Sequence, residues 1–155
     1  VCTLGYEFKR VDVADFGPID PAYVFDRKGA ITCLAIQALA GENLLVSVPG
    51  LIGEQLFISQ DEREREVDAW MGFPRSLRNI ISFTIPAGYK AVGVQNLNMN
   101  IDNETGTFAV QATVDGSTLT LLVKKIYKQT TVKKENWGQF LQMLDAAFNF
   151  SQKRI

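Results

Sequence analysis

The stretch TFAVQATVDGSTLTLLVKKIY, residues 107–127, decides the fold of this chain. It has two arms, and apolar side chains occupy alternate positions on both of them: Phe108, Val110, Ala112 and Val114, then Leu119, Leu121 and Val123. This alternation is typical of an antiparallel strand pair that buries one face against a core. Asp115-Gly116, between the arms, is a two-residue hairpin signal. The stretch therefore predicts a β-hairpin with one buried face.

Upstream of the hairpin, short strand-like segments alternate with turn signals. The expected strands are residues 4–13, 22–25, 30–40, 44–48, 80–85, 89–94 and 96–103. Loops or turns, marked by proline, glycine or charged residues, are expected at residues 16–21, 26–29, 41–42, 49–50 and 86–88. Short strands separated in this way are typical of a β-sandwich or barrel.

Downstream of the hairpin, the period of the apolar residues changes from 2 to 3.6. One helical face is apolar and consists of Trp137, Phe140, Leu141, Leu144, Ala147 and Phe148. The opposite face is mostly polar and includes Lys133, Lys134, Gln139, Gln142 and Asp145. This pattern predicts an amphipathic helix of about four turns that lies on the sheet.

These elements predict a mainly β fold, an antiparallel β-sandwich with one C-terminal amphipathic α-helix packed on a sheet. With 155 residues, the chain is expected to form a single domain, 1–155. A subdivision near residues 61–75 would separate N-terminal strands (1–60) from C-terminal strands plus the helix (61–155). The sequence leaves open whether residues 1–60 belong to the same sandwich.

A charged segment stands at the start of the second half. If residues 62–69 form a strand, the acidic residues share one face and the arginines share the other. The acidic face holds Glu62, Glu64, Glu66 and Asp68, and the other holds Arg63, Arg65, Val67 and Ala69. One interpretation is a site for a cation or a basic ligand. The other is a solvent-facing edge strand whose charges discourage aggregation, which we favour because the arginines partly cancel the acidic field.

The chain contains no histidine. Histidine is the usual general base of hydrolases and the usual nitrogen ligand of catalytic metals. Its absence excludes a Ser-His-Asp or Cys-His mechanism within this chain, and it also excludes a typical zinc site. We therefore expect no cofactor and no enzyme activity from the chain on its own.

Charge and hydropathy restrict the partners. Sixteen basic and seventeen acidic residues give a net charge of −1, which argues against a nucleic-acid-binding protein. No apolar run approaches the ~20 residues that a membrane span needs. We expect neither nucleic acid nor a membrane span for this chain.

Three aromatic residues are candidates for a ligand-binding platform: Trp70, Phe73 and Tyr89. Trp70 and Phe73 lie in the segment AWMGFP, where no periodicity predicts that they are buried. Trp137, by contrast, shares the apolar face of the expected helix and is predicted to lie in the core.

The two cysteines, Cys2 and Cys33, are too few for a disulfide scaffold. They are expected to be small buried apolar residues, with a single bridge as the alternative. The chain begins at Val1 rather than methionine and shows no signal peptide, so we expect a fragment of a larger protein.

Three segments carry a family resemblance. They are Arg65-Glu66-Val67-Asp68 with the following Gly72-Phe73-Pro74, Phe83-Thr84-Ile85-Pro86-Ala87-Gly88-Tyr89, and residues 103–155 with an Asn-x-x-Gly-x-Phe strand. Together they resemble the C-terminal β-sandwich domain, of unknown function, of bacterial cell-envelope proteins that carry a transglutaminase-like (papain-like cysteine protease) domain. The resemblance covers about residues 61–155 well and residues 1–60 poorly.

The resemblance implies an exported protein, periplasmic or at the cell surface, in which the catalytic Cys, His and Asp belong to a neighbouring domain. None of them maps onto a residue of this chain. The expected function is a non-catalytic accessory or interaction domain that positions the catalytic domain or its substrate. The alternative is a carbohydrate- or peptidoglycan-binding module that uses Trp70, Phe73 and Tyr89. The expected partners are accordingly the catalytic domain of the same protein and a cell-wall or surface glycan.

Overall fold

The computed structural model describes residues 2–9, 26–33, 37–40, 43–46, 52 and 54–154, with side chains for residue 52 and residues 54–154. The strands are β1 (Cys2–Lys9), β2 (Asp26–Cys33), β3 (Gln37–Ala40), β4 (Asn43–Val46), β5 (Ala69–Trp70), β6 (Arg75–Thr84), β7 (Met99–Asp102), β8 (Gly106–Asp115), β9 (Thr118–Tyr127) and β10 (Thr131–Val132). The helices are η3 (Gln60–Glu62), η4 (Val94–Leu97), η5 (Lys134–Asn136) and α2 (Trp137–Ser151).

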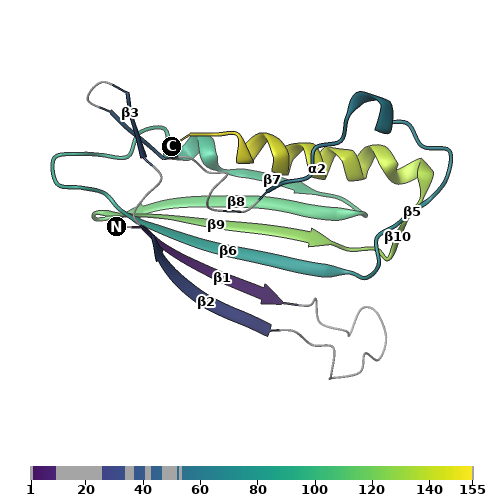
Figure 1. Cartoon of the computed structure of the whole chain (residues 1–155), viewed down its shortest axis with the longest axis horizontal. Coiled ribbons are helices and arrows are strands. Elements are labelled where there is room, and N and C mark those ends of the chain that lie inside the picture. The colour runs from purple at the N-terminus through teal and green to yellow at the C-terminus, as the bar shows by residue number, and fades with distance from the viewer. Residues whose placement is uncertain are drawn as a thin grey trace.

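Six strands form one antiparallel sheet in the order β2-β1-β6-β9-β8-β7 (Figure 1). Two short antiparallel ladders, β3-β4 and β10-β5, complete the strand pairing of the described residues. Strands β1 and β2, from the N-terminal part of the chain, thus share a sheet with β6 to β9. Within the described part, no helix is long and apolar enough to cross a membrane.

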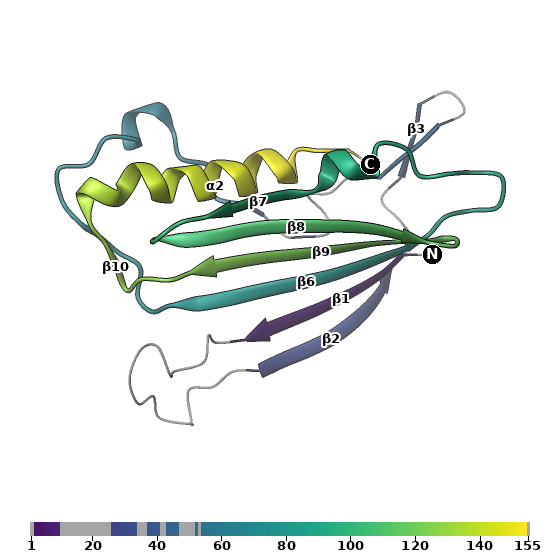
Figure 2. The ribbon, with the colours of Figure 1, turned by 180° about the vertical axis from the view of Figure 1, so that it is seen from behind.

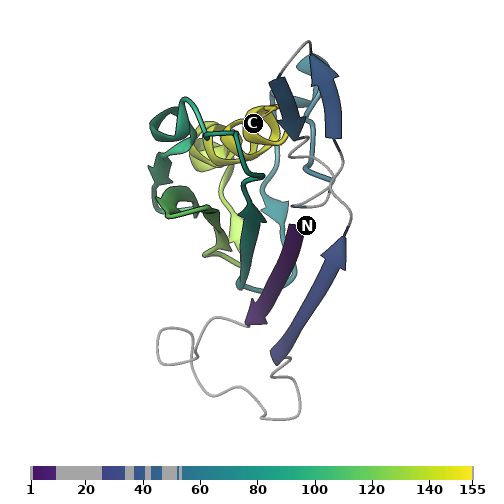
Figure 3. The same ribbon diagram turned by 90° about the vertical axis from the view of Figure 1, so that its left-hand side faces the viewer.

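Helix α2 lies on one face of the sheet, over β7 and β8, whereas β1 and β2 extend the sheet away from it (Figure 3). The predicted mainly β antiparallel class and the C-terminal helix packed on a sheet are therefore confirmed. The core between the two layers is aromatic and aliphatic. Its most deeply buried large side chains are Phe108, Ile81, Leu121, Phe140, Met143, Leu144 and Phe150.

The predicted hairpin is present, with its turn one residue later than expected. Asp115 pairs with Thr118, so the loop residues are Gly116 and Ser117. Gly116 has a φ of 55°, the left-handed conformation that type II′ turns need at their first loop position. The predicted apolar face is buried except at Val114, which lies near the tip and is exposed.

The buried face of the helix matches the predicted face, except at Phe148, Met143 and Phe150. Trp137 is buried, as expected, but Phe148 is only half-buried. Met143 and Phe150, which the apolar pattern omitted, are fully buried. Gly106 allows this approach, because a Cβ there would lie 2.9 Å from Met143 Cε and 2.6 Å from the Ile126 carbonyl oxygen. A glycine is therefore required where β8 begins under the helix.

Several strand predictions were wrong. Residues 62–69 do not form a strand: Glu62 ends η3, residues 63–68 are irregular chain, and only Ala69, which begins β5, is paired. Residues 89–93 are also irregular, with Gly88 before them and Gly93 at their end in the left-handed region, and η4 begins at Val94. Left-handed residues interrupt the extended backbone that a strand requires, which explains the second error.

Two further predictions mistook local composition for structure. The expected turn at residues 26–29 is the first half of β2, where pairing with β1 outweighs the turn-forming residues. The single strand expected at residues 30–40 is divided between β2 and β3, which belong to different sheets. The loop predicted at 16–21, the strand at 22–25 and the turns at 41–42 and 49–50 lie outside the described residues.

Cys2 and Cys33 are paired positions of the β1-β2 ladder, directly opposite one another. Both interpretations given above for these cysteines stay predictions. A disulfide requires that the two Cα atoms lie close together. The register allows this, because paired antiparallel residues have Cα separations of roughly 4.5–5.5 Å.

Candidate functional site

The charged segment before β5 is held against α2 and its N-terminal flank. Arg63 donates from Nη1 and Nη2 to the two carboxylate oxygens of Asp145 on α2. This hydrogen bond raises the pKa of Arg63. Asp68 accepts from Lys133 Nζ at 2.8 Å and from the Lys134 backbone N–H at 3.0 Å. The Lys133 ammonium, with that backbone N–H, lowers the pKa of the Asp68 carboxyl.

These contacts replace the predicted acidic strand. Glu62, another member of the expected stripe, accepts at Oε2 from the hydroxyl and the backbone N–H of Ser59 and caps η3. The edge-strand interpretation is therefore wrong, and no cluster of metal-ligating residues occurs within the described ranges. Two charged residues of this segment, Arg63 and Asp68, hold it against α2 and its N-terminal flank.

Trp70 is the most exposed aromatic side chain of the described residues, at 78% of its full surface. Its backbone is anchored: Trp70 pairs with Thr131 in the β10-β5 ladder, and Met71 N donates to Thr130 O at 2.7 Å. Phe73 follows at 47% exposure, after Gly72 with a φ of 85°. We call Trp70 and Phe73 the aromatic end of the domain.

Tyr89, the third predicted platform residue, lies elsewhere. It is 45% exposed and belongs to the loop that follows β6, whereas Trp70 and Phe73 precede β6. Ten residues of β6 span roughly 33 Å, so the loop lies at the opposite end of the sheet from β5 (Figures 1 and 2). The structure brings Trp70 and Phe73 together in one segment and leaves Tyr89 apart from them.

A stack of alternating cations and rings runs inward from the aromatic end. The Arg75 guanidinium carbon lies 5.8 Å from the centre of the Phe73 ring and 3.9 Å from that of Tyr127. Lys125 Nζ lies 5.2 Å from the same Tyr127 ring. Arg75 Nη1 also donates to the carbonyls of Met71 at 3.0 Å and Phe73 at 3.4 Å, which fixes the turn behind Trp70. The three contacts between a cation and a ring lie within the distance of a cation–π interaction.

The same stack continues into the helix. Tyr127 lies 6.0 Å from Phe140, and Phe140 lies 5.4 Å from Trp137, measured between ring centroids. The Arg65 guanidinium covers the Trp137 ring at 4.5 Å. Among the described residues, Trp137 Nε1 is a buried donor without a hydrogen-bond partner. The prediction that Trp137 belongs to the core is confirmed.

A cavity of about 270 Å³ opens beside Tyr127, between the sheet and the side chains of Ile52, Glu54 and Gln55. Arg75 and Asn79 of β6 and Lys125 of β9 line its sheet side. Lys125 is only 8% exposed, and its Nζ donates to Gln55 Oε1 at 3.0 Å. The candidate residues chosen from the sequence did not include Lys125, although it continues the alternation of Leu119, Leu121 and Val123 and therefore shares their buried face.

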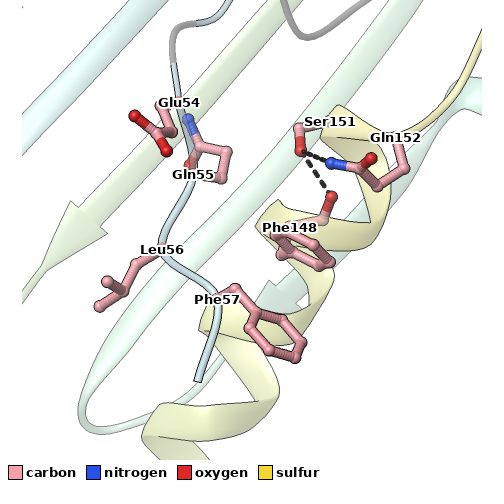
Figure 4. Close-up of a pocket in the computed structure, with 7 residues that line it drawn as sticks. All are labelled: Glu54, Gln55, Leu56, Phe57, Phe148, Ser151 and Gln152. Carbon is pink, nitrogen blue, oxygen red and sulfur yellow. Dashed lines mark hydrogen bonds between the residues drawn. The ribbon is translucent and has the colours of Figure 1, made fainter. Parts of the chain in front are cut away.

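A second, larger hollow of about 750 Å³ lies at the C-terminal end of α2. Figure 4 shows the Phe57 and Phe148 rings side by side, with centroids 5.0 Å apart, and Leu56 directed away from the helix. Ser151 Oγ donates to the Phe148 carbonyl at 2.6 Å and accepts from Gln152 Nε2 at 3.0 Å. These two bonds close the end of the helix beside an exposed apolar surface.

Comparison with known proteins identifies the family. A family model described as "Domain of Unknown Function with solved-structure structure (DUF3858)" matches residues 46–155. The chain belongs to the DUF3858 family. No curated protein and no solved structure matches it.

The DUF3858 match includes every side chain of the aromatic end, the cation–ring stack and both cavities. Strands β1, β2 and β3 lie outside the matched range, although β1 pairs with β6 along eight residues. The candidate site of this DUF3858 domain is therefore built by the family's own part of the fold, with β1 supporting β6 from the side.

Proposed function

We propose that this DUF3858 domain is a non-catalytic accessory domain whose aromatic end binds a neighbouring protein domain. The observation that carries the proposal is the 78% exposure of Trp70 on an anchored strand pair. Tryptophan and arginine are enriched among the residues that contribute most to protein–protein binding. Here the exposed Trp70 lies five positions before Arg75, whose guanidinium donates to the Met71 carbonyl and contacts the Phe73 ring.

The anchoring of the aromatic end favours binding. The backbone hydrogen bonds of this segment and the hydrogen bonds from Arg75 are already present in the unbound domain. A surface that is already ordered loses less conformational entropy on association. Val67, in the same segment, adds a third exposed apolar side chain. The segment thus offers a preformed apolar surface.

We propose further that the partner is a transglutaminase-like catalytic domain of the same protein, exported to the periplasm or cell surface. The support is the resemblance of residues 61–155 to the C-terminal domain of such proteins and the absence of histidine from this chain. A catalytic histidine would have to come from the neighbouring domain. This domain would position the catalytic domain or its substrate.

A second candidate function is glycan binding, because exposed aromatic rings can stack on sugar faces. Trp70 and Phe73 are exposed and only three positions apart in the chain, which favours them for this role. Tyr89 lies at the other end of β6, so the proposed glycan site consists of Trp70 and Phe73 without Tyr89. A cell-wall glycan such as peptidoglycan is the expected ligand.

Tryptophan fluorescence distinguishes the two functions. The chain has two tryptophans, so a Trp137→Phe variant emits from Trp70 alone. We expect a blue shift of this emission when the transglutaminase-like domain of the parent protein is added. A shift with soluble peptidoglycan fragments instead would favour the glycan function, and no shift with either would refute both. Tyr89→Ala is the matched control and should leave the response unchanged.

A further inference from the structure

We propose that the cavity beside Tyr127 binds the anionic group of a small ligand, a carboxylate or a phosphate. Two cationic side chains, Arg75 and Lys125, line it together with the amide of Asn79. The proposal concerns a different ligand and a different surface from the aromatic end, and it does not rest on the proposed function.

Lys125 is the central observation. It is 8% exposed, and among the described residues its ammonium contacts the neutral Gln55 Oε1 and the Tyr127 ring, with no carboxylate paired to it. A buried charge without an opposite charge carries a desolvation cost that a bound anion would offset. An apolar residue at this position would continue the buried face of β9 without that cost. A lysine here is better explained by a ligand than by packing.

Arg75 supplies the second charge. Its hydrogen bonds to the Met71 and Phe73 carbonyls use Nη1 alone. Within the described residues, the N–H donors of Nε and Nη2 therefore remain available to a ligand. Guanidinium groups bind carboxylates and phosphates through such paired N–H donors. Glu54 also lines the cavity, but it is exposed to solvent and leaves a net charge of +1 on the lining.

The size of the cavity restricts the ligand. A volume of about 270 Å³ is slightly below the roughly 300–1,000 Å³ of pockets that hold drug-sized ligands. The cavity therefore suits a small anion or the charged terminal group of a longer molecule. The apolar side chains of Leu77 and Val123 on its wall would cover the carbon atoms next to that group.

The proposal is tested by titrating the chain with inorganic phosphate and, separately, with succinate at constant ionic strength. Amide chemical shifts of residues 75, 79 and 125 are followed by NMR. We expect saturable shifts with at least one probe, and the stronger probe identifies the phosphate or the carboxylate as the preferred group. Lys125→Met should weaken this binding at least tenfold, whereas Lys124→Met should not. Lys124 is the matched control because it neighbours Lys125 in β9 but is exposed on the other face.

A second variant keeps the test independent of folding defects in Lys125→Met. Asn79→Asp places a carboxylate in the cavity, so it should abolish phosphate and succinate binding and raise the thermal unfolding midpoint. The proposal is overturned if neither probe gives saturable shifts, if Lys124→Met loses as much affinity as Lys125→Met, or if Asn79→Asp binds both anions as the unmodified chain does.

Discussion

Arg63 and Asp145 are 82 positions apart in the chain and form a two-point ion pair, with Nη1 bound to Oδ1 at 3.2 Å and Nη2 bound to Oδ2. The pair joins the irregular segment before β5 to the middle of α2. It explains why that segment is not a strand: its arginine side chain is directed to the helix rather than alternating across a sheet. The aromatic end is held in place from this side.

The first prediction concerns this ion pair. Arg63→Gln and Asp145→Asn should each lower the thermal unfolding midpoint, because each removes one charge of the pair and breaks its two-point hydrogen bonding. The double variant should melt close to the less stable single variant, because both substitutions break one interaction. Differential scanning calorimetry measures the three midpoints. Additive losses would show that the two side chains do not act as a pair.

Local patterns accounted for the hairpin and the helix, since both depend on residues close in sequence. Periods of 2 and 3.6 placed the buried faces of β9 and α2, although they left out the buried residues Lys125, Met143 and Phe150. The segment at 62–69 could not be predicted, because the partner of Arg63 is 82 positions away and the partner of Asp68 is 65 positions away. Alternating charges in a sequence do not reveal such distant partners.

The candidate site was predictable in the same limited way. Trp70 and Phe73 were singled out because no periodicity buries them, and both are exposed. The sequence did not show that Tyr89 lies at the other end of the sheet from Trp70 and Phe73, because this depends on the length and direction of β6. Lys125 was overlooked because its charge marked it as a surface residue, although its phase along β9 placed it inward. For Lys125, the alternation of residues along β9 predicts burial correctly, whereas its charge does not.

The second prediction separates the two tryptophans. Trp70→Ala should change the free energy of unfolding by less than about 0.5 kcal/mol, because the side chain is largely exposed. Trp137→Ala should lower it by about 3–5 kcal/mol, because a buried aromatic side chain is removed from the core. Urea unfolding at pH 7 measures both. A large loss for Trp70→Ala would mean that this residue stabilises the fold, and would weaken the proposed binding role.

The third prediction follows from the pKa of Asp68, which the hydrogen bond from Lys133 lowers below its ordinary value of 3.8. A carboxyl whose pKa is lowered by folding stabilises the folded state above the unfolded pKa. This contribution is lost as the pH falls from about 4 through the folded pKa. Asp68→Asn should therefore be less stable than the unmodified chain at pH 7, and this difference in stability should be smaller at about pH 3. An equal difference at both pH values would contradict the assignment.

The fourth prediction concerns the glycine beneath the helix. Gly106→Ala should lower the free energy of unfolding by about 1–3 kcal/mol, because its Cβ would lie 2.6 Å from a backbone oxygen and 2.9 Å from Met143. Gly138→Ala is the matched control: a Cβ at this position of α2 meets nothing within 4 Å. It should be neutral or stabilise the chain by up to about 1 kcal/mol. Equal effects at the two positions would argue against the close approach of α2 to β8.

The last prediction concerns Asn103, which fastens the β7-β8 turn to the helix. Its Oδ1 accepts from Thr105 N, Thr105 Oγ1 and Gly106 N at 3.0, 2.8 and 3.1 Å. Its Nδ2 donates to the Gln139 carbonyl at 2.9 Å. Asn103→Ala removes all four bonds and leaves the fully buried Thr105 hydroxyl without that acceptor, so we expect a loss of about 1–3 kcal/mol.

Asn103→Asp distinguishes the turn from the helix contact. The carboxylate keeps the three acceptor bonds of the turn and loses only the donor to Gln139, so its loss of stability should be smaller than that of Asn103→Ala. Amide hydrogen exchange adds the location: Asn103→Ala should speed exchange at residues 105 and 106, and Asn103→Asp should not. If Asn103→Asp is as damaging as Asn103→Ala, the bond to the helix, rather than the turn, is what this asparagine maintains.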